Sequence, residues 1–141
     1  MTTIQAIRDD FAFLDEWEDR YRYVIDLGAA LPAFPGEARL DVYKVPGCVS
    51  QVWLVTKVGK GVDPVIELQG DSDAHIVRGL VAIMLALFSG RKASEIMGID
   101  AEAVLRELGL DEHLSPQRAN GLRSMVKRIR RDAEAALKHP A

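Results

Sequence analysis

The segment from Ile76 to Phe88 constrains the fold more than any other part of the chain. Its apolar side chains cover most of the circumference of a helix: Ile76, Val77, Leu80, Val81, Met84, Leu85 and Phe88. A helix that is apolar on nearly all sides must be surrounded by other elements. This one is too short to span a bilayer and is interrupted by Arg78 and Gly79. We therefore expect a central buried helix, with Asp71 or Ser72 as its N-cap.

Helical periodicity is found on both sides of this segment. Residues 3–31 carry two apolar stripes, which predict two helices or one bent helix. Downstream, short helices are expected from Ala93 to Met97 and from Ala101 to Leu108. Ser115-Pro116 supplies an N-cap and a first helical residue for a long final helix. The inward stripe of that helix is predicted to contain Leu122, Met125, Val126, Ile129, Ala133 and Ala136.

Between residues 38 and 69 the apolar period changes to two, which indicates strands. Three runs follow one another: Leu40 to Val45, Val52 to Val58, and Val65 to Gln69. Pro46-Gly47 separates the first two, and Gly59-Lys60-Gly61 is typical of a hairpin turn between the last two. We predict an α+β fold in which a small antiparallel three-stranded sheet packs against several helices. With 141 residues, no internal repeat and no long linker, we expect one domain spanning residues 1–141.

The charge of the chain bears on its partners. A formal net charge of -3 argues against a surface built as a whole to hold nucleic acid. The final helix does carry a basic run, Lys127, Arg128, Arg130 and Arg131, which could touch nucleic acid but also fits a solvated face balanced by acidic residues. The N-terminus lacks the features of a signal peptide. We expect a cytoplasmic protein that binds no nucleic acid and no membrane.

Cys48 is the only cysteine, so it cannot form an internal disulfide. The Pro46-Gly47 turn can lift it off the sheet, and Ser50 and Gln51 could hydrogen-bond the loop backbone or a sulfur anion. The reactive species is the thiolate, and an unperturbed cysteine is only a few per cent ionised at pH 7. Either local donors lower the pKa of Cys48, or its reaction partner brings an activated sulfur.

Other readings of these residues stay open at this point. Cys48 could be a small buried hydrophobe, Trp53 could be a core residue, and Ser50 and Gln51 could simply satisfy a turn. A cysteine hydrolase needs a nearby histidine, but His75, His113 and His139 are expected at a helix start, in a loop and at the C-terminal end. One cysteine and scattered histidines provide no metal-ligand spacing, so we predict no metal.

The loop from Gly47 to Trp53 closely resembles the sulfur-acceptor loop of the SufE family. Three further segments are similar to family motifs: Trp17 to Gly28, Asp71 to Leu80, and Leu114 to Leu122. They stand in the family's order and cover nearly the whole chain. The resemblance implies a SufE/IscU-like fold. Val49 departs from it, because family members often carry a polar residue such as Gln at that position.

The resemblance also implies a function. Cys48 would accept persulfide sulfur from a pyridoxal-phosphate-dependent cysteine desulfurase, stimulate that enzyme and relay the sulfur to an iron-sulfur cluster scaffold protein. Gly47, Ser50, Gln51 and Trp53 would support the loop. Asp73 and Arg118 match charged family positions and are expected to border the cysteine loop or the desulfurase-binding face. The protein would carry no cofactor and would not be an independent enzyme, and a homodimer is one possible form.

Overall fold

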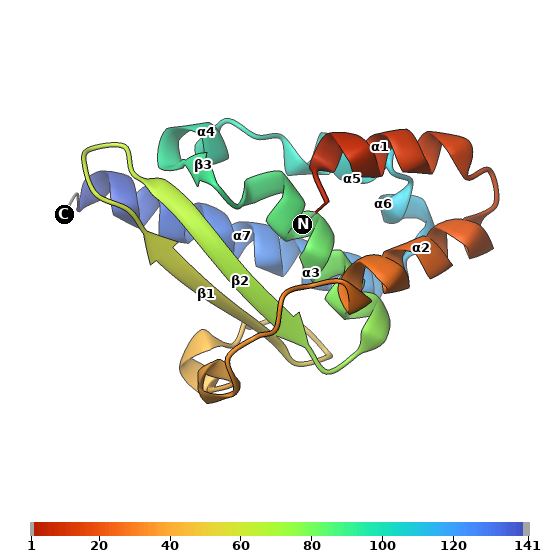
Figure 1. Cartoon of the computed structure of the whole chain (residues 1–141), viewed down its shortest axis with the longest axis horizontal. Helices are drawn as coiled ribbons and strands as arrows, with labels where there is room; N and C mark the ends of the chain where they lie inside the picture. The colour runs from red at the N-terminus through yellow and green to blue at the C-terminus, as the bar shows by residue number, and fades with distance from the viewer. Residues whose placement is uncertain (1, 140–141) are drawn as a thin grey trace.

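The computed structural model describes residues 2–139, and it confirms the α+β class (Figure 1). Its elements, in chain order, are α1 (Ile4–Phe13), α2 (Trp17–Ala29), the 3-10 helices η1 (Gly36–Ala38) and η2 (Asp41–Tyr43), β1 (Val52–Val58), β2 (Val65–Ser72), α3 (His75–Phe88), β3 (Arg91–Lys92), α4 (Ala93–Met97), α5 (Ala101–Glu107), α6 (Leu110–His113) and α7 (Pro116–Lys138). None of the described helices combines the length and the apolar character needed to cross a bilayer.

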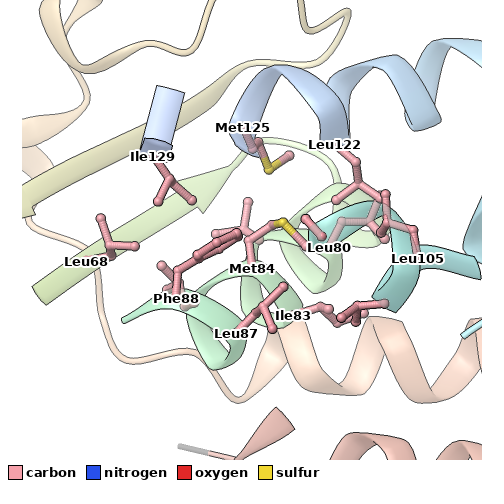
Figure 2. Packing of buried hydrophobic residues seen from close by; sticks show 14 of the residues in the cluster. Leu68, Leu80, Ile83, Met84, Leu87, Phe88, Leu105, Leu122, Met125 and Ile129 are labelled. Carbon is pink, nitrogen blue, oxygen red and sulfur yellow. The ribbon is translucent and has the colours of Figure 1, made fainter. Parts of the chain in front are cut away.

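The predicted central helix is α3, and 11 of its 14 residues are buried. Figure 2 shows Met84 and Phe88 of this helix close to Met125 and Ile129 of α7 and to Leu68 of β2. On another side α3 meets α2 almost backbone to backbone. A Cβ on Gly28 would stand 2.6 Å from the backbone nitrogen of Gly79. The apolar circumference of α3 is thus covered by the sheet, α7 and α2, as its sequence requires.

The N-cap prediction for α3 was wrong. The helix begins at His75 with Ala74 as its N-cap, whereas Asp71 and Ser72 are the last residues of β2. Asp71 is instead engaged by two arginines, and the Ser72 hydroxyl donates to the Gln51 carbonyl at 2.7 Å. The Asp71 carboxylate is thus occupied by tertiary partners, whereas the Ser72 hydroxyl also accepts from the Ala74 N–H at 3.3 Å, one residue before the helix begins.

The sheet has three antiparallel strands in the order β1-β2-β3. The hairpin between β1 and β2 lies at the predicted turn, with Val58 paired to Ile66 and Val52 to Ser72 at its two ends. The third strand is Arg91–Lys92, so the predicted strand from Leu40 to Val45 was wrong. That run forms η2 and a single bridge from Lys44 to Trp53. The alternation of apolar and polar residues gave a wrong prediction here because Leu40 and Val42 are exposed and do not pack on the core.

The sheet has two covered faces because its side chains alternate. Val52, Leu54, Ile66 and Leu68 belong to the main core with α3 and α7. On the opposite face, Trp53 packs with Phe34 and Ala38 in a small second core. Phe34 and Ala38 come from residues 30–44, which we call the strap. Asp71 stands opposite Trp53 on β2 and accepts from Arg39 of the strap at 2.8 Å, which ties the strap to the sheet.

The C-terminal half follows the predictions closely. α4 has the predicted bounds, and α5 stops before Gly109, which adopts a φ of +72°. The short helix α6 was not predicted. At the start of α7 the Ser115 hydroxyl accepts from the Arg118 N–H, as expected of an N-cap. The predicted inward stripe of α7 is buried except for Val126, which is half-buried.

Candidate functional site

Cys48 lies on a loop of residues 46–51, the cysteine loop, which joins the strap to β1. The neck of this loop is closed by a 2.8 Å hydrogen bond that the Val45 N–H donates to the Val52 carbonyl. Gly47 has a φ of +86°, as the predicted Pro46-Gly47 turn requires. A Cβ at Gly47 would come 2.6 Å from the hydroxyl of Ser124, so the turn rests directly against α7.

Gln51 fixes the other end of the cysteine loop. Its backbone N–H and its side-chain amide donate to the two carboxylate oxygens of Asp73, at 3.1 and 3.2 Å. Its carbonyl accepts from the Ser72 hydroxyl and, at 3.3 Å, from the Asp73 N–H. Asp73 therefore borders the cysteine loop, one of the two settings expected for it. It precedes α3 by two residues, so it does not lie in the first turn of that helix.

The thiol is half-buried between the loop and α7, where it donates a hydrogen bond to the Gly121 carbonyl at 3.6 Å. It borders a cavity of about 370 Å³. Buried Val77, Leu80 and Met125 line this cavity together with the more exposed side chains of Ser50, Gln117 and Arg118. A group attached to the Cys48 sulfur would meet an apolar wall formed by α3 and α7 and a polar one next to solvent.

Burial raises the pKa of the Cys48 thiol above its usual value. Desolvation disfavours the thiolate, and the hydrogen bond to a carbonyl uses the thiol proton. Of the two possibilities that the sequence left open, local lowering of the pKa is not what this geometry provides. At neutral pH the resting side chain is a neutral thiol.

This environment predicts a shifted pH profile for alkylation of Cys48 by iodoacetamide. The midpoint should lie above that of an unstructured cysteine, about 8.5, and should return to that value in denaturant. Because the folded-state pKa is the higher one, this group's contribution to stability is complete below the unfolded pKa and is lost as the pH rises through the folded pKa. A folded-state midpoint at or below that of the denatured chain would contradict this description of the site.

Gly47→Ala should disturb the site more than a surface glycine substitution would. The alanine backbone would have to keep a positive φ, and its Cβ would also collide with Ser124. We expect a loss of about 1–3 kcal/mol in unfolding free energy, or displacement of the loop seen as faster alkylation of Cys48. Gly36→Ala is the matched control, because the nearest atom to its new Cβ would be 3.8 Å away on the Arg39 side chain. Equal, small effects of the two substitutions would show that the turn is not constrained.

The other predicted residues fall into two groups. Ser50 and Arg118 line the cavity at Cys48, so both lie close to the thiol. Trp53 is buried in the second core on the opposite face of the sheet and forms a bridge with Lys44, the last residue of the strap. None of the three histidines lines the cavity at Cys48. His75 begins α3, His113 stacks on Trp17 at 4.5 Å and His139 is the C-cap of α7.

The part of α7 that faces the cysteine loop was not predicted from the sequence. Gly121 supplies the carbonyl for the thiol, and Ser124 supports the Gly47 turn. One signal was available, because a glycine inside a long helix weakens it and often marks a close approach. Within residues 2–139, no three His, Cys, Asp or Glu side chains are grouped as a metal ion would require.

Comparisons with known proteins identify the family. The model of the family described as "SufE: Fe-S metabolism associated domain" matches residues 5–133. An uncharacterized SufE-like protein of Rhizobium meliloti (strain 1021) is 62% identical over 97% of this chain and 99% of its own length. Another from Rhizobium etli is 59% identical over 95% of this chain and 91% of its own length.

The fold also has a solved counterpart. The solution structure of a hypothetical protein from Thermus thermophilus covers 96% of both chains with a TM-score of 0.75. Its 20% identity makes this a likeness of fold alone. The family match over nearly the whole chain and the two close relatives carry the assignment. The chain belongs to the SufE family, whose domain is associated with iron-sulfur metabolism.

Proposed function

We propose that this protein accepts sulfur on Cys48 from the persulfide of a pyridoxal-phosphate-dependent cysteine desulfurase, stimulates that enzyme and passes the sulfur to an iron-sulfur cluster scaffold protein. The observation that carries the proposal is the setting of the only thiol. Cys48 lies on a loop fixed at both ends, half-buried beside a cavity that can hold one more sulfur atom. The family's association with iron-sulfur metabolism supports the same role.

The transfer is a thiol exchange that needs no external oxidant or reductant. Cys48 gives its proton to solvent or to a base of the partner, and its thiolate attacks the outer sulfur of the donor persulfide. A new bond forms between the Cys48 sulfur and that outer sulfur while the donor's S–S bond breaks. The donor cysteine leaves as a thiolate and takes up a proton. Cys48 then carries the persulfide S–SH.

The raised pKa of Cys48 suits a carrier better than an independent catalyst. A neutral thiol reacts slowly with stray oxidants, and the desulfurase supplies a sulfur that is already activated. Ser50 and Arg118 line the cavity that would receive the added sulfur, and the Gln51–Asp73 hydrogen bonds would hold the loop for docking. The role is that of an accessory protein without a cofactor, and a reducing cytoplasmic setting fits its single thiol.

A direct test is mass spectrometry of the intact protein without reductant. The protein is incubated with a cysteine desulfurase from the same organism, pyridoxal phosphate and cysteine. We expect the mass to increase by one sulfur atom, located on Cys48 by peptide mapping, and desulfurase turnover to rise. If the desulfurase becomes loaded and this protein does not, the proposal is wrong.

A further inference from the structure

A second cavity, also of about 370 Å³, borders the cysteine loop. Pro46 and Gly47 line it from the loop, and α7 contributes Ser124, Lys127, Arg128 and Arg131. Three of its six lining residues are therefore cations. The chain as a whole carries a net charge of -3, so the charge around this cavity is opposite in sign to that of the whole protein. Such a local field selects partners of opposite charge.

These cations continue the row of α7 that contacts the thiol. Gly121, Ser124, Arg128 and Arg131 follow one another at spacings of three, four and three residues, which places them along one helix face. At 1.5 Å per residue, Arg131 lies about 15 Å along the axis from Gly121, whose carbonyl accepts from Cys48. A basic track thus leads away from the thiol along α7, the helix drawn in blue in Figure 1.

The three cations differ in how firmly they are already engaged. The Arg128 side chain is only 12% exposed, pairs with Asp132 at 3.1 Å and donates to the Lys44 carbonyl, so it holds α7 against the end of the strap. Asp132 also accepts from the Thr56 hydroxyl at 2.7 Å. By contrast, Lys127 is exposed. The Arg131 side chain is 69% exposed, and its ion pair with Asp132 is long, at 3.8 Å. Lys127 and Arg131 are therefore the cations available to a partner.

The geometry of sulfur transfer brings a partner to this surface. The donor sulfur must reach bonding distance of Cys48, so the donor surface is centred near the cysteine loop. A standard interface buries about 800 Å² per partner, a patch roughly 16 Å in radius if circular. Lys127 and Arg131, about 9 and 15 Å along α7 from Gly121, fall within that radius. Opposite charge at such a rim mainly raises the association rate and fixes the orientation.

We propose that Lys127 and Arg131 bind an acidic surface of the sulfur donor, next to its persulfide-bearing cysteine. The inference rests on the proposed function and adds the recognition chemistry of the partner. A protein carboxylate surface is favoured over nucleic acid because the chain is acidic overall and only two exposed cations line the cavity. Nucleic-acid affinity grows with the number of phosphates that are neutralised.

The test compares Lys127→Glu/Arg131→Glu with wild type and with Lys60→Glu/Arg106→Glu. The control makes the same charge change at exposed residues that line neither cavity at the cysteine loop. The measured quantity is the second-order rate at which a desulfurase loaded from cysteine transfers sulfur to Cys48. We expect the first variant to be at least about tenfold slower at ~50 mM salt and within about twofold of wild type at ~500 mM salt. The control should stay within about twofold throughout.

Two further measurements separate the outcomes. Alkylation of Cys48 by neutral iodoacetamide should be unchanged in the variant, which would show that the loop is intact. Equal transfer rates for variant and wild type at low salt would overturn the inference while leaving the proposed function standing, because wild type still loads. Salt-dependent binding of wild type to a single-stranded oligonucleotide, lost in the variant without any change in transfer, would assign the surface to nucleic acid instead. No loading of wild type would reject both proposals.

Discussion

Cys48→Ser should abolish sulfur loading and leave the fold intact. With the only thiol removed, no added sulfur should be detectable by mass, and stimulation of the desulfurase should disappear. The serine hydroxyl is close in size to the thiol and can still donate to the Gly121 carbonyl. Because the side chain is half-buried and makes this one hydrogen bond, we expect unfolding free energy to change by less than about 1 kcal/mol.

A relocated thiol provides the matched control. In Cys48→Ser/Val49→Cys the chain keeps one cysteine, moved by one residue to a position where the native side chain is 77% exposed. Val49 lies on the same loop and also lines the cavity at Cys48, so the control changes only the position of the thiol relative to the Gly121 carbonyl. If that position matters, the relocated thiol should load at least about tenfold more slowly, because a misplacement of about 1 Å can cost that much in rate. Loading at the wild-type rate would show that any accessible thiol suffices. A large loss of stability in Cys48→Ser alone would instead favour a role for Cys48 in the core.

Asp71→Ala should cause a large loss of stability. The Asp71 side chain is only 9% exposed, and its two oxygens accept from Arg39 and Arg78 at 2.8–3.0 Å. Removing one partner of a buried ion pair usually costs about 3–5 kcal/mol. The two arginine side chains are 42% and 35% exposed and can turn to water, so we expect about 2–3 kcal/mol.

In Asp71→Ala the loss of structure should begin at the strap, because Arg39 joins the strap to β2 through Asp71. The chain has two tryptophans, so in a Trp17→Phe background the fluorescence reports Trp53 beneath the strap alone. Asp71→Ala should shift that emission to longer wavelength. Asp41→Ala is the control on the same segment, since its carboxylate is almost fully exposed and its ion pair with Lys44 should leave stability unchanged when removed. Equal effects of the two substitutions would show that Asp71 does not hold the strap.

The helices were largely predictable because their evidence is local. An apolar circumference identifies α3, and the Ser115-Pro116 pair identifies the start of α7 from residues adjacent in the chain. The strand predicted from Leu40 to Val45 failed for the opposite reason. Its alternation is compatible with a strand, but strand formation depends on a neighbour with which to pair, and only Lys44 found one.

The candidate site also has features that depend on neighbouring residues and features that depend on distant ones. Three features of the site can be read from the residues in order: Cys48 is the only thiol, a Pro-Gly turn precedes it, and its loop resembles the sulfur-acceptor loop of the SufE family. The environment of the thiol depends instead on contacts between residues far apart in the chain. The carbonyl that accepts from Cys48 belongs to Gly121, 73 residues away, and the carboxylate that fixes Gln51 belongs to Asp73, 22 residues away.

The pKa of Cys48 shows why the environment of the thiol could not be predicted from the sequence. A thiol's ionisation depends on how much water reaches it and on which groups face it, and packing of α3 and α7 against the loop sets both. Short-range sequence patterns record turns and helix faces, because those depend on neighbouring residues. Desolvation depends on residues that meet only when the chain has folded.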